Sequence, residues 1–131
     1  MILKTFCFES EDGTNVFVYN WMPEDKVAKG VVQIAHGMAE TAERYARFAT
    51  VLTEHGYIVY ANDHRGHGKT AGTLKNVGYL AEKNGFDWMV KDMHQLTNII
   101  KTAHPNLPLF LFGHSMGSFA SQRYLMLHSK E

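Results

Sequence analysis

Leu109-Phe110-Leu111-Phe112-Gly113-His114-Ser115-Met116-Gly117 is the stretch that decides the fold. Its opening residues form a continuous apolar run, which is typical of a strand buried on both faces. The glycines of the G-x-S-x-G pattern that follows lack a Cβ, so the chain can reverse sharply there and a helix can approach the strand. The stretch therefore predicts a buried strand over 109–112, a turn at Ser115 and a helix over 115–128.

Two further pairs of strand and helix precede this stretch, and a hairpin precedes them. Uninterrupted apolar runs indicate buried strands, apolar residues three and four apart indicate helices, and strict alternation indicates the hairpin. The predicted strands are 3–8, 15–21, 31–35, 57–61 and 109–112, and the predicted helices are 41–55, 86–103 and 115–128. Strands that alternate with helices predict an α/β fold with a parallel sheet covered on both faces.

Composition excludes several classes of protein. The 13 basic residues balance the 13 acidic residues, so net charge gives no support for a nucleic-acid partner. The one cysteine, Cys7, cannot form an internal disulfide, and its alternation with Phe6 and Phe8 predicts a buried strand residue. No apolar run approaches the roughly 18 residues of a membrane span, and the N-terminus lacks the order of a signal peptide. A cytoplasmic protein is expected.

Three distinctive segments follow the three buried strands: His36-Gly37-Met38, Asp63-His64-Arg65-Gly66 and Gly113-His114-Ser115-Met116-Gly117. In parallel α/β sheets the functional site lies beyond the carboxyl ends of the strands. The sequence therefore predicts that the three segments converge on one site.

Ser115 has the sequence context of a nucleophile elbow, because its pattern follows a strand and opens a helix. The strained turn would lift the Ser115 hydroxyl clear of the backbone, and the N–H groups at the helix N-terminus would favour a developing anion. The alternative is that Ser115 is merely an N-cap. The interpretation as a nucleophile also requires an oxyanion hole, for which we assign the backbone N–H groups of Met116 and Met38. We interpret His36 as a brace of the loop rather than as a base.

The segment from Asp63 to Thr70 invites two other interpretations, which we reject. Gly68-Lys69-Thr70 resembles the end of a phosphate-binding loop, but Asp63 stands where that loop needs glycine, and no helix is predicted to follow. His64 and His67 alone are weak evidence for a metal site, so no metal is expected. We expect the long loop 63–85 to be braced by Asp63 and Arg65, which would satisfy backbone groups.

Together these segments, with Glu40, Arg44 and Tyr45, resemble the α/β-hydrolases of the monoacylglycerol lipase and lysophospholipase group, also called serine aminopeptidase-like hydrolases. The resemblance implies an acyl-ester hydrolase that uses a serine, a histidine and an aspartate without a cofactor. It implies that Ser115 is the nucleophile, that Met38 and Met116 supply the oxyanion N–H groups, and that Glu40 and Arg44 brace the oxyanion loop. Ser118 departs from the second glycine that the family commonly has after Gly117.

The resemblance also implies that triad members are missing. In this fold the acid and then the histidine follow the serine, but the residues after Ser115 hold only His128 and Glu131. His128 would lie more than three turns along the helix that starts at Ser115. We therefore expect residues 1–131 to be the N-terminal part of a single α/β-hydrolase domain, which would leave the edge of strand 109–112 and apolar helix faces uncovered.

Among substrates, the resemblance favours a small lipid-like ester, of the monoacylglycerol or lysophospholipid type, and transient contact with a membrane surface. A peptidase that releases N-terminal residues is the nearest alternative within the fold, because a fold does not determine a substrate. A chain without catalysis that acts in binding or assembly is the second alternative. The sequence does not determine the oligomeric state.

Overall fold

The computed structural model describes residues 1–25, 27–73 and 76–129. Its five-stranded sheet has the order β1-β2-β4-β3-β5. The strands are β1 (Ile2–Glu9), β2 (Asn15–Met22), β3 (Gly30–Ala35), β4 (Tyr57–Asn62) and β5 (Leu109–Gly113). β1 pairs antiparallel with β2 and β2 with β4, whereas β3 pairs parallel with both β4 and β5. The predicted hairpin and parallel sheet are therefore confirmed.

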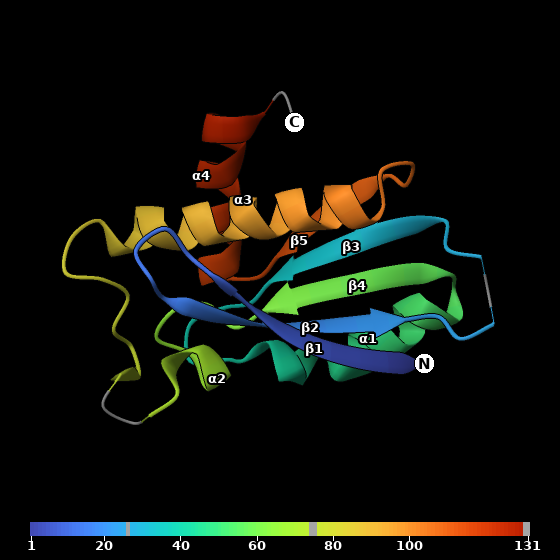
Figure 1. Cartoon of the computed structure of the whole chain (residues 1–131), viewed down its shortest axis with the longest axis horizontal. Helices are drawn as coiled ribbons and strands as arrows, with labels where there is room; N and C mark the ends of the chain where they lie inside the picture. The colour runs from blue at the N-terminus through green and yellow to red at the C-terminus, as the bar shows by residue number, and fades with distance from the viewer. Residues whose placement is uncertain (26, 74–75, 130–131) are drawn as a thin grey trace.

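Helices cover both faces of this sheet (Figure 1). They are the 3-10 helix η1 (Ala42–Tyr45) and the α-helices α1 (Ala46–Glu54), α2 (Gly68–Ala71), α3 (Gly85–Ala103) and α4 (Met116–His128). Helix α1 lies on one face, and α3 and α4 lie on the other. Within the described residues no helix is long and apolar enough to cross a lipid bilayer.

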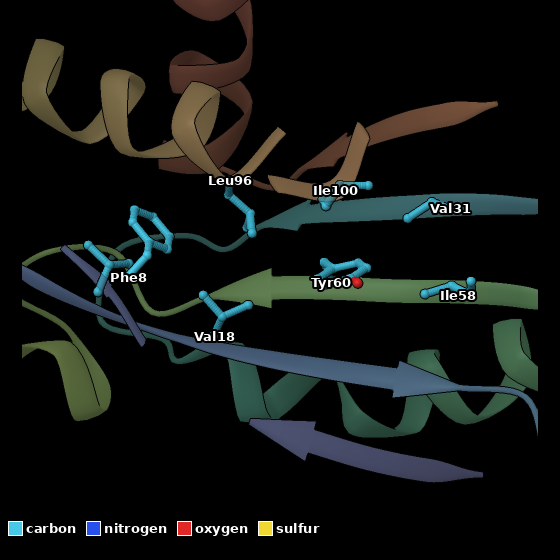
Figure 2. Close-up of a cluster of buried hydrophobic side chains, with 8 residues drawn as sticks. Phe8, Val18, Val31, Ile58, Tyr60, Leu96 and Ile100 are labelled. Carbon is cyan, nitrogen blue, oxygen red and sulfur yellow. The ribbon is translucent and has the colours of Figure 1, made fainter. Parts of the chain in front are cut away.

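The two faces of the sheet have separate cores because side chains alternate along the central strands. Val31 and Ile58 point toward α3, where they pack with Leu96 and Ile100 (Figure 2). The next residues along the same strands, such as Val32, join the core on the α1 side. Burial of successive residues on opposite faces explains why β3 and β4 read as continuous apolar runs.

Two predictions of burial were wrong, and both concern edge strands. Cys7 is exposed, because β1 is an edge strand whose Phe8 packs in the core on the α3 side while the neighbouring side chain points the other way. On β5, Phe110 is 52% exposed and Phe112 is 40% exposed. In the described chain β5 pairs with β3 alone. The expected uncovered apolar surface on α4 is present, since its Phe119 is 65% exposed.

The loop after β4 also differs from its prediction, because Gly68–Ala71 forms the short helix α2. The loop is fastened by Arg65, a side chain only 1% exposed. Its guanidinium donates to Asp92 (Nε to Oδ2, 2.8 Å), to Asp12 (Nη1 to Oδ2, 2.7 Å) and to Ser10 (Nη2 to Oγ, 3.1 Å).

We expected Arg65 to form hydrogen bonds with backbone groups of the loop, and this expectation was largely wrong. One bond, from Nη1 to the Leu80 carbonyl oxygen at 3.1 Å, is of that kind. The other bonds go to the carboxylates of Asp12 and Asp92 and to the hydroxyl of Ser10. They join the loop after β4 to the β1–β2 turn and to helix α3. Burial raises the pKa of Asp92 although Arg65 opposes this shift, whereas the hydrogen bond from Arg65 lowers the pKa of Asp12. Arg65 therefore offsets part of the effect of burial on the Asp92 carboxylate.

We predict that Arg65→Met lowers the free energy of unfolding by about 3–5 kcal/mol, because Asp92 would be left buried without its counter-charge. Urea denaturation followed by circular dichroism measures the change. The matched control is Arg123→Met, which removes an ion pair to Asp87 whose partners are 39% and 45% exposed. We expect the control to lose less than about 1 kcal/mol. Equal losses in the two variants would contradict the role assigned to Arg65.

Candidate active site

The three segments that follow β3, β4 and β5 meet at the carboxyl edge of the sheet, as predicted. The backbone N–H of His114 donates to the Ala35 carbonyl oxygen at 3.1 Å, which joins the end of β5 to the end of β3. The backbone N–H of His64 donates to Nε2 of His36 at 3.0 Å, which joins the residues after β4 to those after β3.

Ser115 adopts a strained backbone conformation at this edge. Its φ of 54° and ψ of −117° lie outside the regions that residues with a side chain ordinarily occupy. α4 begins at the next residue, and the N–H of Phe119 donates to the Ser115 carbonyl oxygen at 3.1 Å. Ser115 stands at the N-cap position, but its side chain makes no capping hydrogen bond. The hydroxyl is therefore exposed at a helix N-terminus without the structural duty that the alternative interpretation gave it.

Glycines at 113 and 117 are required by close contacts between backbones. A Cβ on Gly117 would collide with the carbonyl oxygen of Ala35 and would lie 2.6 Å from the carbonyl oxygen of His36. A Cβ on Gly113 would lie 2.6 Å from the Gly117 carbonyl oxygen. Because these obstacles are backbone atoms, they cannot be relieved by a change of rotamer.

The loop after β3 packs directly against Ser115. A Cβ on Gly37 would lie 3.2 Å from the Cβ of Ser115. Met38, at the tip of this loop, is 69% exposed. Met116 is the first residue of α4, so its N–H belongs to the turn that has no intrahelical acceptor. Met116 thus directly follows Ser115, and Met38 directly follows Gly37; the role of their N–H groups as oxyanion donors remains a prediction.

A carboxylate braces each side of this loop. Oε2 of Glu40 accepts the N–H of Gly37 at 2.7 Å and the hydroxyl of Tyr45 at 3.0 Å. The buried Asp63 accepts the backbone N–H groups of Ala42 at 2.8 Å and Lys69 at 2.9 Å. The predicted bracing by Asp63 through backbone groups is confirmed.

The structure differs from the predicted site at two residues, Arg44 and Tyr45. Arg44 is exposed on η1, and within the described chain its side chain forms no hydrogen bond or ion pair, so the structure gives it no bracing contact. Tyr45, by contrast, was missing from the predicted site. Its helical spacing with apolar residues indicated only a core position, and nothing in the sequence placed its hydroxyl beside a carboxylate.

His36 is a neutral, fully engaged histidine. Its Nε2 accepts a backbone N–H and must therefore be unprotonated, which leaves Nδ1 to donate to the Gly37 carbonyl oxygen at 2.7 Å. Burial lowers the pKa of His36, and burial together with the neighbouring His36 and His67 lowers the pKa of His64 further. The prediction that His36 braces the loop is confirmed.

No histidine of the described chain forms a hydrogen bond with the Ser115 hydroxyl. His128 ends α4, roughly 18 Å along the helix axis from its start. Its ring stacks on that of His94 with centroids 3.7 Å apart. His128 therefore lies far from Ser115, as expected.

Comparisons with known proteins identify the family of this chain. Residues 26–131 match the family described as serine aminopeptidase, S33. Monoacylglycerol lipase of Mycolicibacterium smegmatis is 39% identical over 110 residues, which cover 84% of this chain and 37% of the relative. Monoglyceride lipase of Rattus norvegicus is 34% identical over 84% of this chain and 34% of the relative.

A solved structure gives the same result. The thermostable carboxyl esterase from Bacillus coagulans superimposes with a TM-score of 0.90 at 37% identity, over 98% of this chain and 41% of the esterase. The chain therefore spans about a third to two fifths of the length of these relatives.

We predict that Gly117→Ala destabilises the fold by about 2–3 kcal/mol, because the added methyl group meets the immobile carbonyl of Ala35. The direction of the change in stability distinguishes this contact from ordinary helix propensity, since glycine-to-alanine changes inside helices ordinarily stabilise by about 1 kcal/mol. Urea denaturation measures the effect, with Ser118→Ala on the same helical turn as the control. A Gly117→Ala variant as stable as the unaltered protein would contradict the packing described here.

We also predict that stability falls on mild acidification. The pKa values of His36 and His64 are lower in the folded than in the unfolded protein, whose ordinary value is 6.5, so below this pH the unfolded state binds protons first. Stability is complete above about pH 6.5, and as the pH falls each histidine contributes a loss of up to roughly 1.4 kcal/mol per pH unit. Denaturation at pH 7.5 and 5.5 tests this expectation.

Two variants identify the source of the pH dependence. His64→Phe should show a clearly smaller loss between the two pH values, because one buried titrating ring is gone. The exposed His55 serves as the matched control, and His55→Gln should behave like the unaltered protein. An unchanged pH dependence in His64→Phe would contradict the assignment.

Proposed function

Because this chain belongs to the serine aminopeptidase (S33) family, within the α/β-hydrolase fold, we propose that it carries the nucleophile half of a serine hydrolase active site. Ser115 would attack the carbonyl carbon of an acyl ester. The single observation that carries the proposal is the backbone of Ser115, a serine held at a φ of 54° where a strand turns into a helix, with its hydroxyl exposed. Such strain persists where the surrounding structure enforces it, and it concentrates at functional sites.

The proposed chemistry proceeds in two steps. Attack by Oγ of Ser115 gives a tetrahedral intermediate, which expels the alcohol and leaves an acyl-enzyme that water then hydrolyses. The N–H groups of Met116 and Met38 would stabilise the oxyanion, a contribution typically of about 3–4 kcal/mol per donor. The support for this assignment is the position of Met116 at the first turn of α4 and the contact of the Gly37 backbone with Ser115.

We propose that residues 1–131 correspond to the N-terminal part of a single α/β-hydrolase domain. The acid, the base and a cap over the acyl pocket would then belong to the part of the domain that the relatives have beyond the matched segment. Two observations support this proposal: the share of the relatives that the chain spans, and the apolar side chains exposed beside β5, such as Phe110 and Phe112.

Among substrates we propose monoacylglycerols or similar lipid-like acyl esters, because relatives from two distant organisms are named for that substrate. A substrate of this kind implies transient contact with a lipid surface, and the lone Cys7 is consistent with a cytoplasmic setting. The description of the family favours an aminopeptidase as the second candidate. Hydrolysis of a monoacylglycerol compared with that of an aminoacyl amide distinguishes the two.

We predict that a fluorophosphonate probe adds once to a protein that carries the whole proposed domain, as measured by intact mass, and that Ser115→Ala abolishes the adduct. Ser118→Ala, three residues along the same turn, should label like the unaltered protein. Ester hydrolysis should fall at least about a thousandfold in Ser115→Ala. A protein that neither labels nor hydrolyses esters would overturn the proposed activity and favour a binding or assembly role for the fold.

A further inference from the structure

One carboxylate oxygen joins three segments of the site. Oε2 of Glu40 lies 2.7 Å from the backbone nitrogen of Gly37, on the loop after β3, and 3.0 Å from the hydroxyl of Tyr45 on η1. The same oxygen lies 3.4 Å from Nδ1 of His114, the residue that precedes the proposed nucleophile. Glu40 thus connects the oxyanion loop to the elbow through a histidine that can carry or lack a charge.

We propose that Glu40 and His114 form a proton-dependent clasp that positions the oxyanion loop against Ser115. This inference rests on the function proposed above and names two positioning residues for it. When His114 takes up a proton, its contact with Glu40 becomes an ion pair and the loop is held to the elbow. When the proton leaves, the loop keeps only its bonds to Glu40, and the link to the elbow weakens.

The charge on Glu40 is well suited to this role. Burial works against the ionised carboxylate, but the hydrogen bonds from Gly37 and Tyr45, together with the interaction with His114, outweigh it and lower the pKa of Glu40. The carboxylate therefore stays charged at neutral and mildly acidic pH. The side chain of His114 is 60% exposed, whereas that of Glu40 is 21% exposed. The histidine can thus exchange protons with solvent while the carboxylate remains fixed in the loop.

The other titratable groups near Glu40 do not substitute for His114. From η1, Tyr45 faces the carboxylate as a hydrogen-bond donor, and burial, followed by its bond to Glu40, raises its pKa to about 12, so it remains neutral. From the end of β3, His36 is buried, with both ring nitrogens engaged by backbone groups. His114 is therefore the group of this set that solvent protons reach directly.

A change in the clasp would alter the position of the oxyanion loop relative to Ser115. A Cβ on Gly37 would lie 3.2 Å from both the Ser115 Cβ and the His114 carbonyl oxygen, so the loop lies too close to the elbow for a side chain at position 37 to fit without displacement. Met38 follows Gly37 directly, and a small displacement of the loop would move the Met38 N–H relative to the Ser115 hydroxyl. Oxyanion donors act only when they are held at hydrogen-bond distance from the developing charge.

The first test follows the clasp without catalysis. The backbone amide of Gly37 and the imidazole of His114 are monitored by NMR from pH 5 to pH 8 in the unaltered protein. The Gly37 amide is expected to titrate with the midpoint measured for His114. In His114→Gln this transition should disappear, while the amide stays shifted downfield by its bond to Glu40. In Glu40→Gln the downfield shift itself should be reduced.

The second test measures reactivity. The rate of fluorophosphonate labelling of Ser115 is compared between the unaltered protein and His114→Gln at each pH, and the ratio cancels the titration of any shared base. The ratio should be roughly 1.5- to 5-fold at the acidic end, the range that an exposed ion pair supports, and should approach one at pH 8. His55→Gln, an exposed histidine on the surface of the protein, should give a ratio of one throughout.

The outcomes separate the clasp from the proposed function. If no variant labels but Gly37 titrates with His114, the clasp stands and the hydrolase activity fails. A Gly37 transition that persists in His114→Gln would assign the titration to another group, such as His36, and overturn the clasp. A labelling ratio that is the same at every pH would also overturn it, because a merely structural role for His114 predicts no dependence on its protonation.

Discussion

The site depends on the contact between the backbone of α4 and the end of β3. Gly117 lies so close to the carbonyl of Ala35 that no side chain fits between them, and the N–H of His114 donates to the same carbonyl at 3.1 Å. Only two residues separate the end of β5 at Gly113 from the start of α4 at Met116, so the chain must reverse within a very short turn. Ser115 absorbs the reversal with a φ of 54°. The exposed hydroxyl is a consequence of this backbone packing.

The order of the strands then determines which segments can reach Ser115. β3 lies between β4 and β5, with Ala35 opposite Gly113 in the register, so the loop after β3 emerges directly beside the elbow. The loop after β4 lies one strand further away and reaches the residues after β3 through His36, which accepts the His64 N–H, and through Asp63, which accepts the Ala42 N–H. This distance explains why Asp63 and Arg65 contact backbone and core carboxylates. Asp63 and Arg65 therefore support the loops around the site, and the candidate functional residues lie after β3 and β5.

Sequence reasoning succeeded where the physics is local. Apolar runs, helical spacing and the glycines of the elbow located the strands, the helices and Ser115, because each depends on neighbours in the chain. It failed where burial depends on distant partners. Cys7 and Phe110 lie on strands that read as buried, yet no pattern along the chain reveals which strand is at the edge of a sheet. The pairing of Arg65 with Asp92, 27 positions apart, is likewise visible only in three dimensions.

The strand that leads to Ser115 lies at an edge of the sheet. β5 is paired with β3 on one side and contacts α4, and the ring of Phe112 lies near those of Phe48, at a centroid distance of 5.1 Å, and Tyr45, at 6.5 Å. An exposed apolar edge of this kind is costly in water and tends to be covered. Whatever covers β5 would bury Phe110 and Phe112 and would also restrict the strand that ends at Gly113. Covering this edge would therefore also restrict the backbone that leads into the turn at Ser115.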